Sequence, residues 1–139
     1  MSDISDSLRE EIKFRAGNRC EYCRLSQLGQ EATFHIDHVI PLAAGGGTLT
    51  DNLALACVSC SLRKGARQAA LDPDSGSEVR LFNPRTQLWQ EHFRWEGERI
   101  VPLTPIGRAT EGALMLNRPL ILAIRHEESI RGRHPPNSS

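Results

Sequence analysis

The sequence has no long hydrophobic run, and none of its apolar stretches approaches the roughly 20 residues that a membrane-spanning helix needs. Its first residues, MSDISDSLREE, are polar and acidic, so they lack the basic start and apolar run of a secretory signal. There is no internal repeat, and a composition that is 39% hydrophobic and 24% charged is ordinary for a globular domain. We therefore expect a cytoplasmic protein without a membrane partner.

The chain also lacks net charge, because its 17 Lys and Arg residues balance its 17 Asp and Glu residues. Neither half carries an excess: residues 1–70 hold eight basic and eight acidic side chains, and residues 71–139 hold nine of each. Many nucleic-acid-binding proteins are basic overall. Any contact with nucleic acid must therefore rely on a local basic patch and not on a field over the whole molecule.

Four cysteines form two Cys-x-x-Cys pairs, Cys20 with Cys23 and Cys57 with Cys60. Disulfides are rare in a reducing cytoplasm. The spacing suits tetrahedral zinc, because each pair forms a tight turn that aims two thiolates at one ion. A redox pair and four unrelated buried thiols are the alternatives. We expect a structural zinc.

The segment between the cysteine pairs predicts a compact ββα outline. Residues 33–41 are rich in β-branched and aromatic residues, which predicts a strand that Pro41 ends. A glycine-rich loop follows, and residues 50–52 resemble an N-cap region that opens a short helical or turn segment over 53–56. After the second cysteine pair, a helix is expected to begin near Ser61.

The rest of the chain predicts a helix at each end of the core and a mixed extension. An N-terminal helix is expected over 8–16, with Ser7 as N-cap in a capping box. Beyond a loop at 72–76 rich in Pro, Gly, Ser and Asp, we expect a hairpin turning at 96–98, a helix capped by Thr104, and a helix restarting at Pro119. The predicted α+β organisation is a core (1–71), a linker loop (72–76), a hairpin-plus-helices extension (77–130) and a disordered tail (131–139).

Asp37 and His38 are the residues best suited to chemistry. A carboxylate is a hard oxygen ligand for Mg²⁺ or a similar cation, and a neutral imidazole can take a proton from water near neutral pH. Cleavage of a phosphodiester needs both a cation and a base. Two adjacent strand residues point to opposite faces, so this pair can converge only where the strand ends or twists.

Several motifs follow one another in a fixed order: His-x-Asp-His-x-x-Pro, a glycine-rich loop, Asp-Asn-Leu, Cys-x-x-Cys and a basic pair. In this order they resemble the HNH endonuclease family. The closest likeness is to the subgroup whose treble-clef-like ββα-metal core is tied by a four-cysteine zinc. The resemblance covers about residues 8–68.

The resemblance implies a role for each motif. The four cysteines would hold the structural zinc, Asp37 would ligate a catalytic Mg²⁺ or Mn²⁺, and His38 would be the general base. Asn52 would orient the loop, and Lys64 with Arg63 would contact phosphate or brace the helix. Ser61 departs from the pattern, because the family usually has Asn or His there as the second ligand of the catalytic metal. A hydroxyl is a shorter and weaker ligand, which favours a weakened or inactive enzyme as the alternative.

Other polar and aromatic residues allow two interpretations. His35 could assist metal or phosphate binding, or hydrogen-bond within the fold. The arginines Arg15, Arg19 and Arg24 could form a phosphate patch or be solvated surface residues. Aromatic residues of the extension could stack on bases, although packing in a hairpin core is the stronger interpretation: Trp89, Phe93 and Trp95. Histidines outside the motif are expected at the surface: His92, His126 and His134.

Two functions from different classes follow. The first is a divalent-metal-dependent DNA endonuclease that nicks as a monomer and needs a homodimer or two events for a double-strand break. The second is a zinc module that binds nucleic acid or protein without cleavage. A weaker, third interpretation assigns a partner-binding surface to the C-terminal half.

Overall fold

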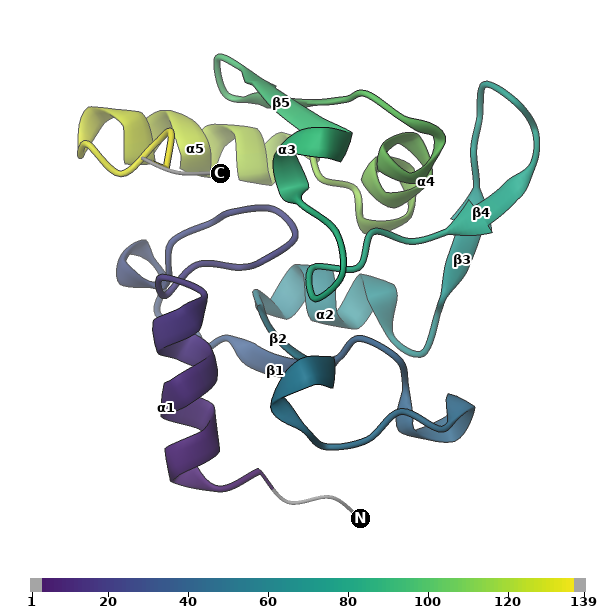
Figure 1. Ribbon diagram of the computed structural model, residues 1–139. Helices are drawn as coiled ribbons and strands as arrows, with labels where there is room; N and C mark the ends of the chain where they lie inside the picture. The colour runs from purple at the N-terminus through teal and green to yellow at the C-terminus, as the bar shows by residue number, and fades with distance from the viewer. Residues whose placement is uncertain (1–3, 137–139) are drawn as a thin grey trace.

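The computed structural model describes residues 4–136 and combines helices with three two-stranded antiparallel sheets (Figure 1). The α+β class predicted from the sequence is confirmed. None of the helices in this range is long and apolar enough to cross a membrane. The helices are α1 (Asp6–Arg15), α2 (Val58–Lys64), α3 (Trp89–His92), α4 (Pro105–Leu114) and α5 (Pro119–Ile130). The strands are β1 (His35–His38), β2 (Leu53–Ala56), β3 (Ala69–Leu71), β4 (Glu78–Arg80), β5 (Phe93–Glu96) and β6 (Arg99–Pro102).

The ββα unit of the core is built from β1, β2 and α2. Strand β1 pairs antiparallel with β2, with Asp37 opposite Ala54. Residues 53–56 form the second strand of the predicted ββα outline and not a helical or turn segment, because all four are buried and pair with β1. The helix also starts earlier than predicted, at Val58 instead of near Ser61. Its N-cap is Cys57, whose side chain accepts a hydrogen bond from the Cys60 N–H.

Helix α1 stands beside this unit and starts one residue before the predicted cap. Its N-cap is Ser5, whose hydroxyl accepts from the Leu8 N–H at 3.1 Å, so the capping role assigned to Ser7 is wrong. The earlier start places Asp6 in the first turn, where a negative charge is favourable. The helix is followed by Gly17 and Asn18, both left-handed with φ of 63° and 57°.

The loop predicted at 72–76 is present, but it connects β3 to β4 and so closes a hairpin. Asp72 at its start is buried and accepts two hydrogen bonds from Arg108 of α4, at 2.8 and 3.0 Å. Hydrogen bonds from Arg108 and Ser75 hold the pKa of Asp72 below its usual range. This ion pair fixes the hairpin to α4, and the division of the chain into domains at this loop stays a prediction.

The second half of the chain follows the predicted outline, with one difference. The hairpin turn expected at 96–98 joins β5 to β6, and Thr104 caps α4 by accepting from the Gly107 N–H. Residues 89–92, expected as part of the hairpin, form the helical turn α3 instead. Of the aromatic residues, Trp89 and Phe93 are buried and their rings are 5.1 Å apart, which supports core packing over base stacking.

The prediction of a disordered tail over 131–139 is wrong for its first residues. Arg133 binds the carboxylate of Glu128, with its Nη2 at 2.7 Å from Oε2. The ring of His134 packs edge-on against Trp95 at 4.6 Å between centroids. Both contacts hold this segment against the extension, and residues 137–139 lie outside the described range.

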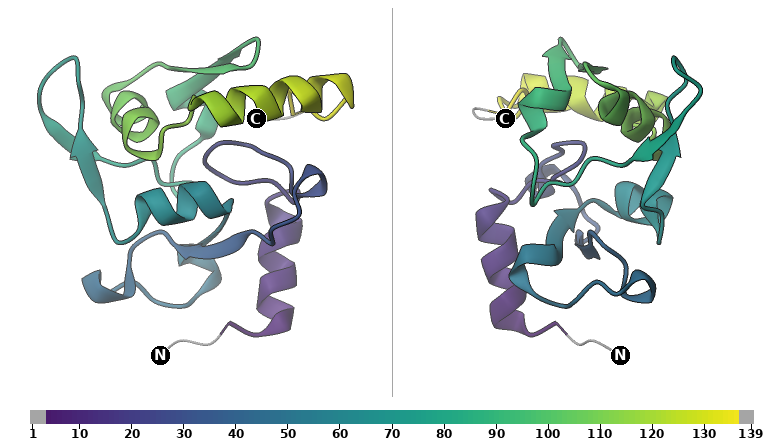
Figure 2. Two further views of the ribbon diagram at one scale, coloured as in Figure 1. Left: turned by 180° about the vertical axis from the view of Figure 1, so that it is seen from behind. Right: turned by 45° about the vertical axis from the view of Figure 1, so that its right-hand side comes forward.

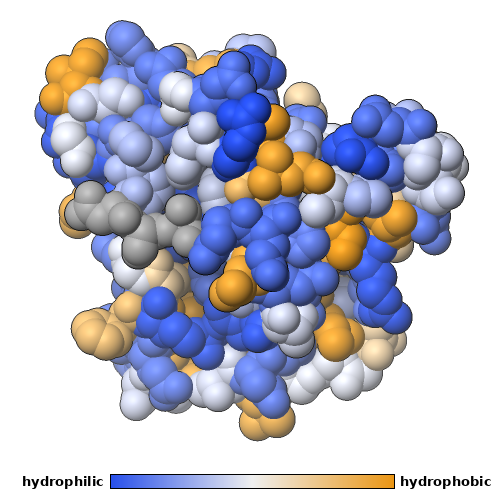
Figure 3. Space-filling view, turned by 45° about the horizontal axis from the view of Figure 1, so that its top comes forward, coloured by the Kyte–Doolittle hydropathy of each residue, from blue (hydrophilic) through white to orange (hydrophobic). Residues whose placement is uncertain are grey.

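The extension covers the core as a second layer, with α4, α5 and the β5–β6 hairpin on one side and α1, β1 and β2 on the other (Figure 2). The first cysteine pair, whose turn over residues 20–23 we call the first knuckle, lies at the boundary between the two layers. There, three successive residues each accept a hydrogen bond from the extension: Glu21 from Arg85, Tyr22 from Trp89 and Cys23 from Arg125. We call these three extension side chains the knuckle anchors. On the face shown in Figure 3, apolar surface occurs only as separate patches among hydrophilic residues.

Candidate active site and metal centre

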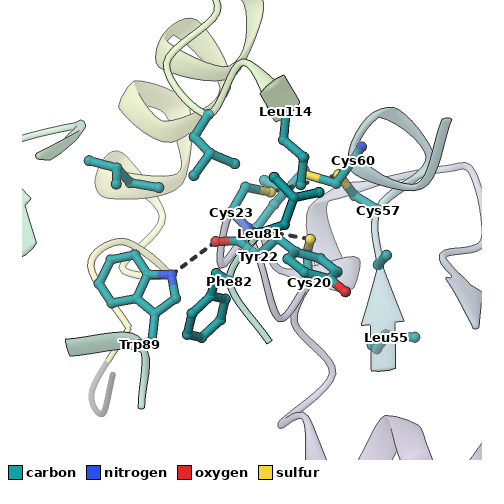
Figure 4. Packing of buried hydrophobic residues seen from close by; sticks show 14 of the residues in the cluster. Cys20, Tyr22, Cys23, Leu55, Cys57, Cys60, Leu81, Phe82, Trp89 and Leu114 are labelled. Atoms are coloured by element: carbon teal, nitrogen blue, oxygen red, sulfur yellow. Dashed lines mark hydrogen bonds between the residues drawn. The ribbon is translucent and has the colours of Figure 1, made fainter. Parts of the chain in front are cut away.

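The four cysteines meet between the first knuckle and the start of α2 (Figure 4). All four are buried, and their sulfur atoms lie within 4.8 Å of one another. The two pairs have the same local geometry: the Cys23 N–H donates to the Cys20 sulfur, and the Cys60 N–H donates to the Cys57 sulfur, each at 3.4 Å. The structure therefore brings together the two halves of the site that the sequence predicts.

This cluster has the size and chemistry that zinc requires. Zn–S bonds of ~2.3 Å in a tetrahedron place sulfur atoms about 3.8 Å apart, and the Cys23 and Cys57 sulfurs are 3.7 Å apart. Hydrogen bonds from the other thiols lower the pKa of Cys57, whereas burial raises the pKa of Cys20 well above its ordinary value. Four buried thiolates need a cation to balance their charge, and a zinc ion held by the four sulfurs would supply it.

Asp37 lies on the face of β1 that is turned towards α2, and only 7% of its surface is exposed. Its Oδ2 accepts a hydrogen bond from the Tyr22 hydroxyl at 2.8 Å and lies 3.2 Å from the Lys64 ammonium. Burial raises the pKa of the Asp37 carboxyl, and the charge of Lys64 opposes that rise. Burial also raises the pKa of Tyr22, so the phenol stays protonated and donates.

Lys64 braces α2 against β1. Its side chain is 2% exposed, and its ammonium also donates to the carbonyl oxygens of His38 and Val39, at 3.1 and 3.0 Å. The charge of Lys64 is therefore used inside the protein, which agrees with the bracing alternative and not with a phosphate contact. Arg63 turns away to the end of α4, where it bonds to Met115, so the structure does not bring it to Asp37.

His38 points to the other side of β1 and is half-buried. Its Nε2 is 2.9 Å from the Thr48 hydroxyl, and its Nδ1 has no hydrogen-bond partner among residues 4–136. Thr48 belongs to the glycine-rich loop after β1. The histidine is thus oriented by that loop, and one ring nitrogen is left for a water molecule.

Asn52 fixes the shape of this loop, as its predicted orienting role requires. Its side-chain amide accepts from the Ile40 N–H and donates to the carbonyl oxygens of Ile40 and Gly47, each at 2.9 Å. The loop folds back so closely on its own start that a Cβ on Gly46 would lie 1.8 Å from the Ile40 oxygen. A glycine is required there because of this approach.

With this geometry in view, the chain was compared with known proteins. Residues 20–67 match the HNH endonuclease family. No curated protein and no solved structure gives a match. The family resemblance stated from the motifs is confirmed, and it indicates nuclease chemistry. We call residues 20–67 the HNH segment; it contains both cysteine pairs, β1, β2 and α2, and the extension lies outside it.

The predicted ligands of a catalytic metal in the HNH segment are already engaged with other residues. Asp37 is paired with Lys64, and the Ser61 hydroxyl is 2.9 Å from Nδ1 of His35. Within residues 4–136, the four cysteines are the only cluster of three or more His, Cys, Asp or Glu side chains that could hold an ion. Asp37 suits a divalent ion by its chemistry, but a second ion at its carboxylate would have to compete with the Lys64 ammonium.

The remaining candidate residues have structural contacts. Arg15 donates to the Thr50 carbonyl at 2.8 Å, Arg19 donates to the Arg24 carbonyl at 2.9 Å, and Arg24 lies over the Trp89 ring at 5.2 Å. These arginines support loops and a ring and do not form a phosphate patch. Histidines outside the HNH segment bond to neighbours within the extension: His92 to Thr104, His126 to Glu98 and His134 to Gly97.

The sequence did not indicate two partners of the predicted catalytic pair, Tyr22 and Thr48. Tyr22 packs edge-on against Phe82 and donates its hydroxyl hydrogen bond to Asp37. No local signal shows this bond, because it joins residues 15 positions apart in different elements. Thr48 has a local signal, since its hydroxyl directly follows the three glycines of the loop that starts near His38, and such a loop can fold back on the imidazole.

Proposed function

We propose that the chain is a divalent-metal-dependent DNA endonuclease that hydrolyses phosphodiester bonds. The observation that carries this proposal is the Asp37–His38 pair at the end of β1 inside the HNH segment, with His38 held by the loop that Asn52 shapes. A cytoplasmic location is part of the proposal, because reducing conditions keep four thiols available for zinc.

His38 would act as the general base. Its Nδ1 is free of protein partners within the described residues, and its Nε2 is held by Thr48. A water bound at Nδ1 would lose a proton to the imidazole as it attacks phosphorus. By analogy with the family, the product would carry a 5′ phosphate and a 3′ hydroxyl.

Two metals belong to the proposal. Zinc held by the four cysteines would be structural. A bound Mg²⁺ or Mn²⁺ would neutralise negative charge on the phosphate and on the leaving oxygen. Asp37 would be its main ligand, with Ser61 as a weaker one. The Lys64 ammonium already faces this carboxylate at 3.2 Å, so we expect weak metal affinity and a need for millimolar ion.

A plasmid-nicking assay tests the proposal. Supercoiled plasmid is incubated with the protein in Mg²⁺ or Mn²⁺, without either ion, and with EDTA. The condition without added ion matters because a chelator could also remove zinc. We expect nicked plasmid only with added ion, and a fall of about 10²–10⁴-fold for His38→Ala, the usual contribution of a general base.

His92→Ala is the matched control, because His92 also bonds to a threonine hydroxyl but lies outside the HNH segment. This variant should nick at the wild-type rate. Intact plasmid across the metal screen would contradict the nuclease proposal. The alternative would then be a zinc module that binds nucleic acid or protein without cleavage, which the Asp37–Lys64 pair and Ser61 both favour.

A further inference from the structure

A cavity of about 190 Å³ opens beside the candidate active site, between the HNH segment and the extension. Two of its lining residues are close to the catalytic pair. Val39 directly follows His38 in the chain, and Lys64 is paired with Asp37. On the other side, the wall is formed by residues of β4 and of the segment that follows it. The cavity is thus contiguous with the catalytic pair but is built largely from residues that the HNH segment does not contain.

The walls of this cavity carry positive charge without a matching negative charge. Arg67 and Arg80 line it, both are exposed, and neither side chain has a hydrogen bond or ion pair within residues 4–136. No carboxylate lines the cavity. Such a concentration of cations favours an anionic ligand. It is also the local basic patch that a chain of zero net charge needs for contact with nucleic acid.

Two side-chain amides add further donors. The carbonyl oxygen of Gln87 accepts from the Asn83 N–H, and the carbonyl oxygen of Asn83 accepts from the Arg85 N–H. Both acceptors are therefore used within the protein, whereas the two NH₂ groups have no partner in the described residues. Asn83 and Gln87 both line the cavity. The groups free to bind a ligand are donors and cations, which match the acceptor oxygens of a phosphate.

The volume sets the size of the ligand. Sites that bury a whole small molecule have roughly 300–1,000 Å³, and this cavity is smaller. It suits one anionic group better than a complete nucleotide. Its open side, with exposed arginines, allows the rest of a strand to continue over the surface.

We propose that this cavity binds one phosphodiester group of the bound DNA strand. This group lies next to the phosphodiester that is cleaved. Arg67 and Arg80 contact its oxygens, and the amides of Asn83 and Gln87 donate to it. This inference rests on DNA being the substrate, as proposed above. It gives the extension a function, which is to position the strand across the catalytic pair.

The first test measures the salt dependence of binding. Binding of a fluorescent duplex is followed by anisotropy between about 50 and 200 mM salt, without added Mg²⁺ or Mn²⁺ so that cleavage does not intervene. We expect Arg67→Gln and Arg80→Gln each to reduce the slope of log K against log [salt] by about 0.9, the value for one lost phosphate contact. Arg99→Gln, an exposed arginine of β6 without a partner in the described residues, should leave the slope unchanged.

The second test locates the phosphate. A set of duplexes, each with one neutral methylphosphonate linkage, is bound to wild type and to Arg80→Gln. We expect one position near the nick at which the neutral linkage weakens wild-type binding and has little effect on the variant. Sodium phosphate at equal ionic strength should compete no better than sodium chloride. Stronger competition by phosphate would overturn the assignment to a DNA strand.

The two proposals can fail separately. Wild-type slopes in both arginine variants would overturn the cavity proposal even if the plasmid is nicked. Reduced slopes in a protein that never nicks would support the cavity and refute the nuclease. Absence of binding at low salt would overturn the cavity proposal. Thermal melts of the variants should match the wild type, since both arginines are exposed.

Discussion

Lys64, the last residue of α2, connects this helix to β1. Its ammonium is 3.2 Å from the Asp37 carboxylate, and the two side chains are 2% and 7% exposed. Its other two hydrogen bonds are accepted by the carbonyl oxygens of His38 and Val39. A buried pair of this kind is costly to break, because removal of one partner leaves an uncompensated charge in a poorly solvated place.

We expect Lys64→Met to lower the free energy of unfolding by about 3–5 kcal/mol, the usual cost of removing one partner of a buried pair. Urea denaturation of the zinc-loaded protein measures it. The control is Lys13→Met, which removes an exposed pair with Glu10 and should cost less than about 1 kcal/mol. The double change Asp37→Leu with Lys64→Met should recover part of the loss, since no charge is left. Equal losses in Lys13→Met and Lys64→Met would show that the buried pair carries no special stability.

At the scale of single residues, the sequence predicts which side chains are candidates for the site better than it predicts which residues they contact. Residue type and spacing were enough to predict that the four cysteines come together and that Asn52 holds the loop, whereas the catalytic roles of Asp37 and His38 stay predictions. They could not predict the Asp37–Lys64 pair, because 27 positions separate its members and the pair depends on how α2 packs on β1. The contact between Ser61 and His35 could not be predicted from the sequence either. That serine is a weak metal ligand was evident from its residue type.

The loop between β1 and β2 is the element that orients His38. Asn52 holds its two sides together, and Thr48 within it bonds to the imidazole. The loop can pass this close only because Gly46 has no side chain. A single added methyl group should therefore disturb both the loop and the histidine.

We expect Gly46→Ala to destabilise the protein by about 1–3 kcal/mol, the usual cost of overpacking, and to reduce plasmid nicking. The cause is the 1.8 Å approach of the new Cβ to the Ile40 oxygen, which forces the backbone to move. Gly47→Ala is the matched control, because its Cβ would meet only the Leu49 side chain at 3.6 Å. Thermal melts and nicking rates give the comparison. Identical behaviour of the two variants would contradict the role given to the loop.

At the scale of elements, local signals placed the hairpin turn at 96–98 and the cap at Thr104, because turn and cap chemistry is carried by neighbouring residues. They failed at 53–56. Residues 50–52 do form a single 3-10 turn, but the chain then extends into β2, whose four residues are all buried. Burial on both faces depends on α2, on α1 and on the extension, and no short window of sequence contains that information.

At the scale of the whole molecule, hydrogen bonds from the knuckle anchors join the extension to the first pair of the four-cysteine site. Each anchor donates a hydrogen bond to one of three successive residues: Glu21, Tyr22 and Cys23. The Trp89 indole, for example, donates to the Tyr22 carbonyl at 2.9 Å (Figure 4). The sequence suggested a linker between core and extension, and it could not show that both would share the first knuckle. That arrangement predicts that metal binding at the four cysteines depends on the extension as well as on the HNH segment.

We expect one zinc per chain, and its removal should loosen the extension as well as the HNH segment. Both tryptophans of the chain lie in the extension. Trp89 donates to the Tyr22 carbonyl, so its emission reports on the contact between the extension and the first cysteine pair, whereas Trp95 reports on the extension itself. Chelation should shift this emission to the red while circular dichroism shows loss of the core. Restoring zinc should reverse both changes.

An exposed single substitution such as Arg131→Gln should leave zinc content and emission unchanged. Two results would count against the coupling. One is a core that unfolds on chelation while tryptophan emission stays constant. The other is a metal-free protein with full thermal stability, which would also remove the zinc assignment.

The knuckle anchors set a limit on how this protein can be shortened. A cut after residue 71 would keep the whole family-matched segment, yet it would leave the buried carboxylate of Glu21 without the Arg85 guanidinium and would strip donors from the next two carbonyls. We therefore expect that residues 20–67 alone do not fold and that a stable protein needs the extension as well. A fusion of this protein to another chain should place the junction beyond α5, after the contact between Arg133 and Glu128.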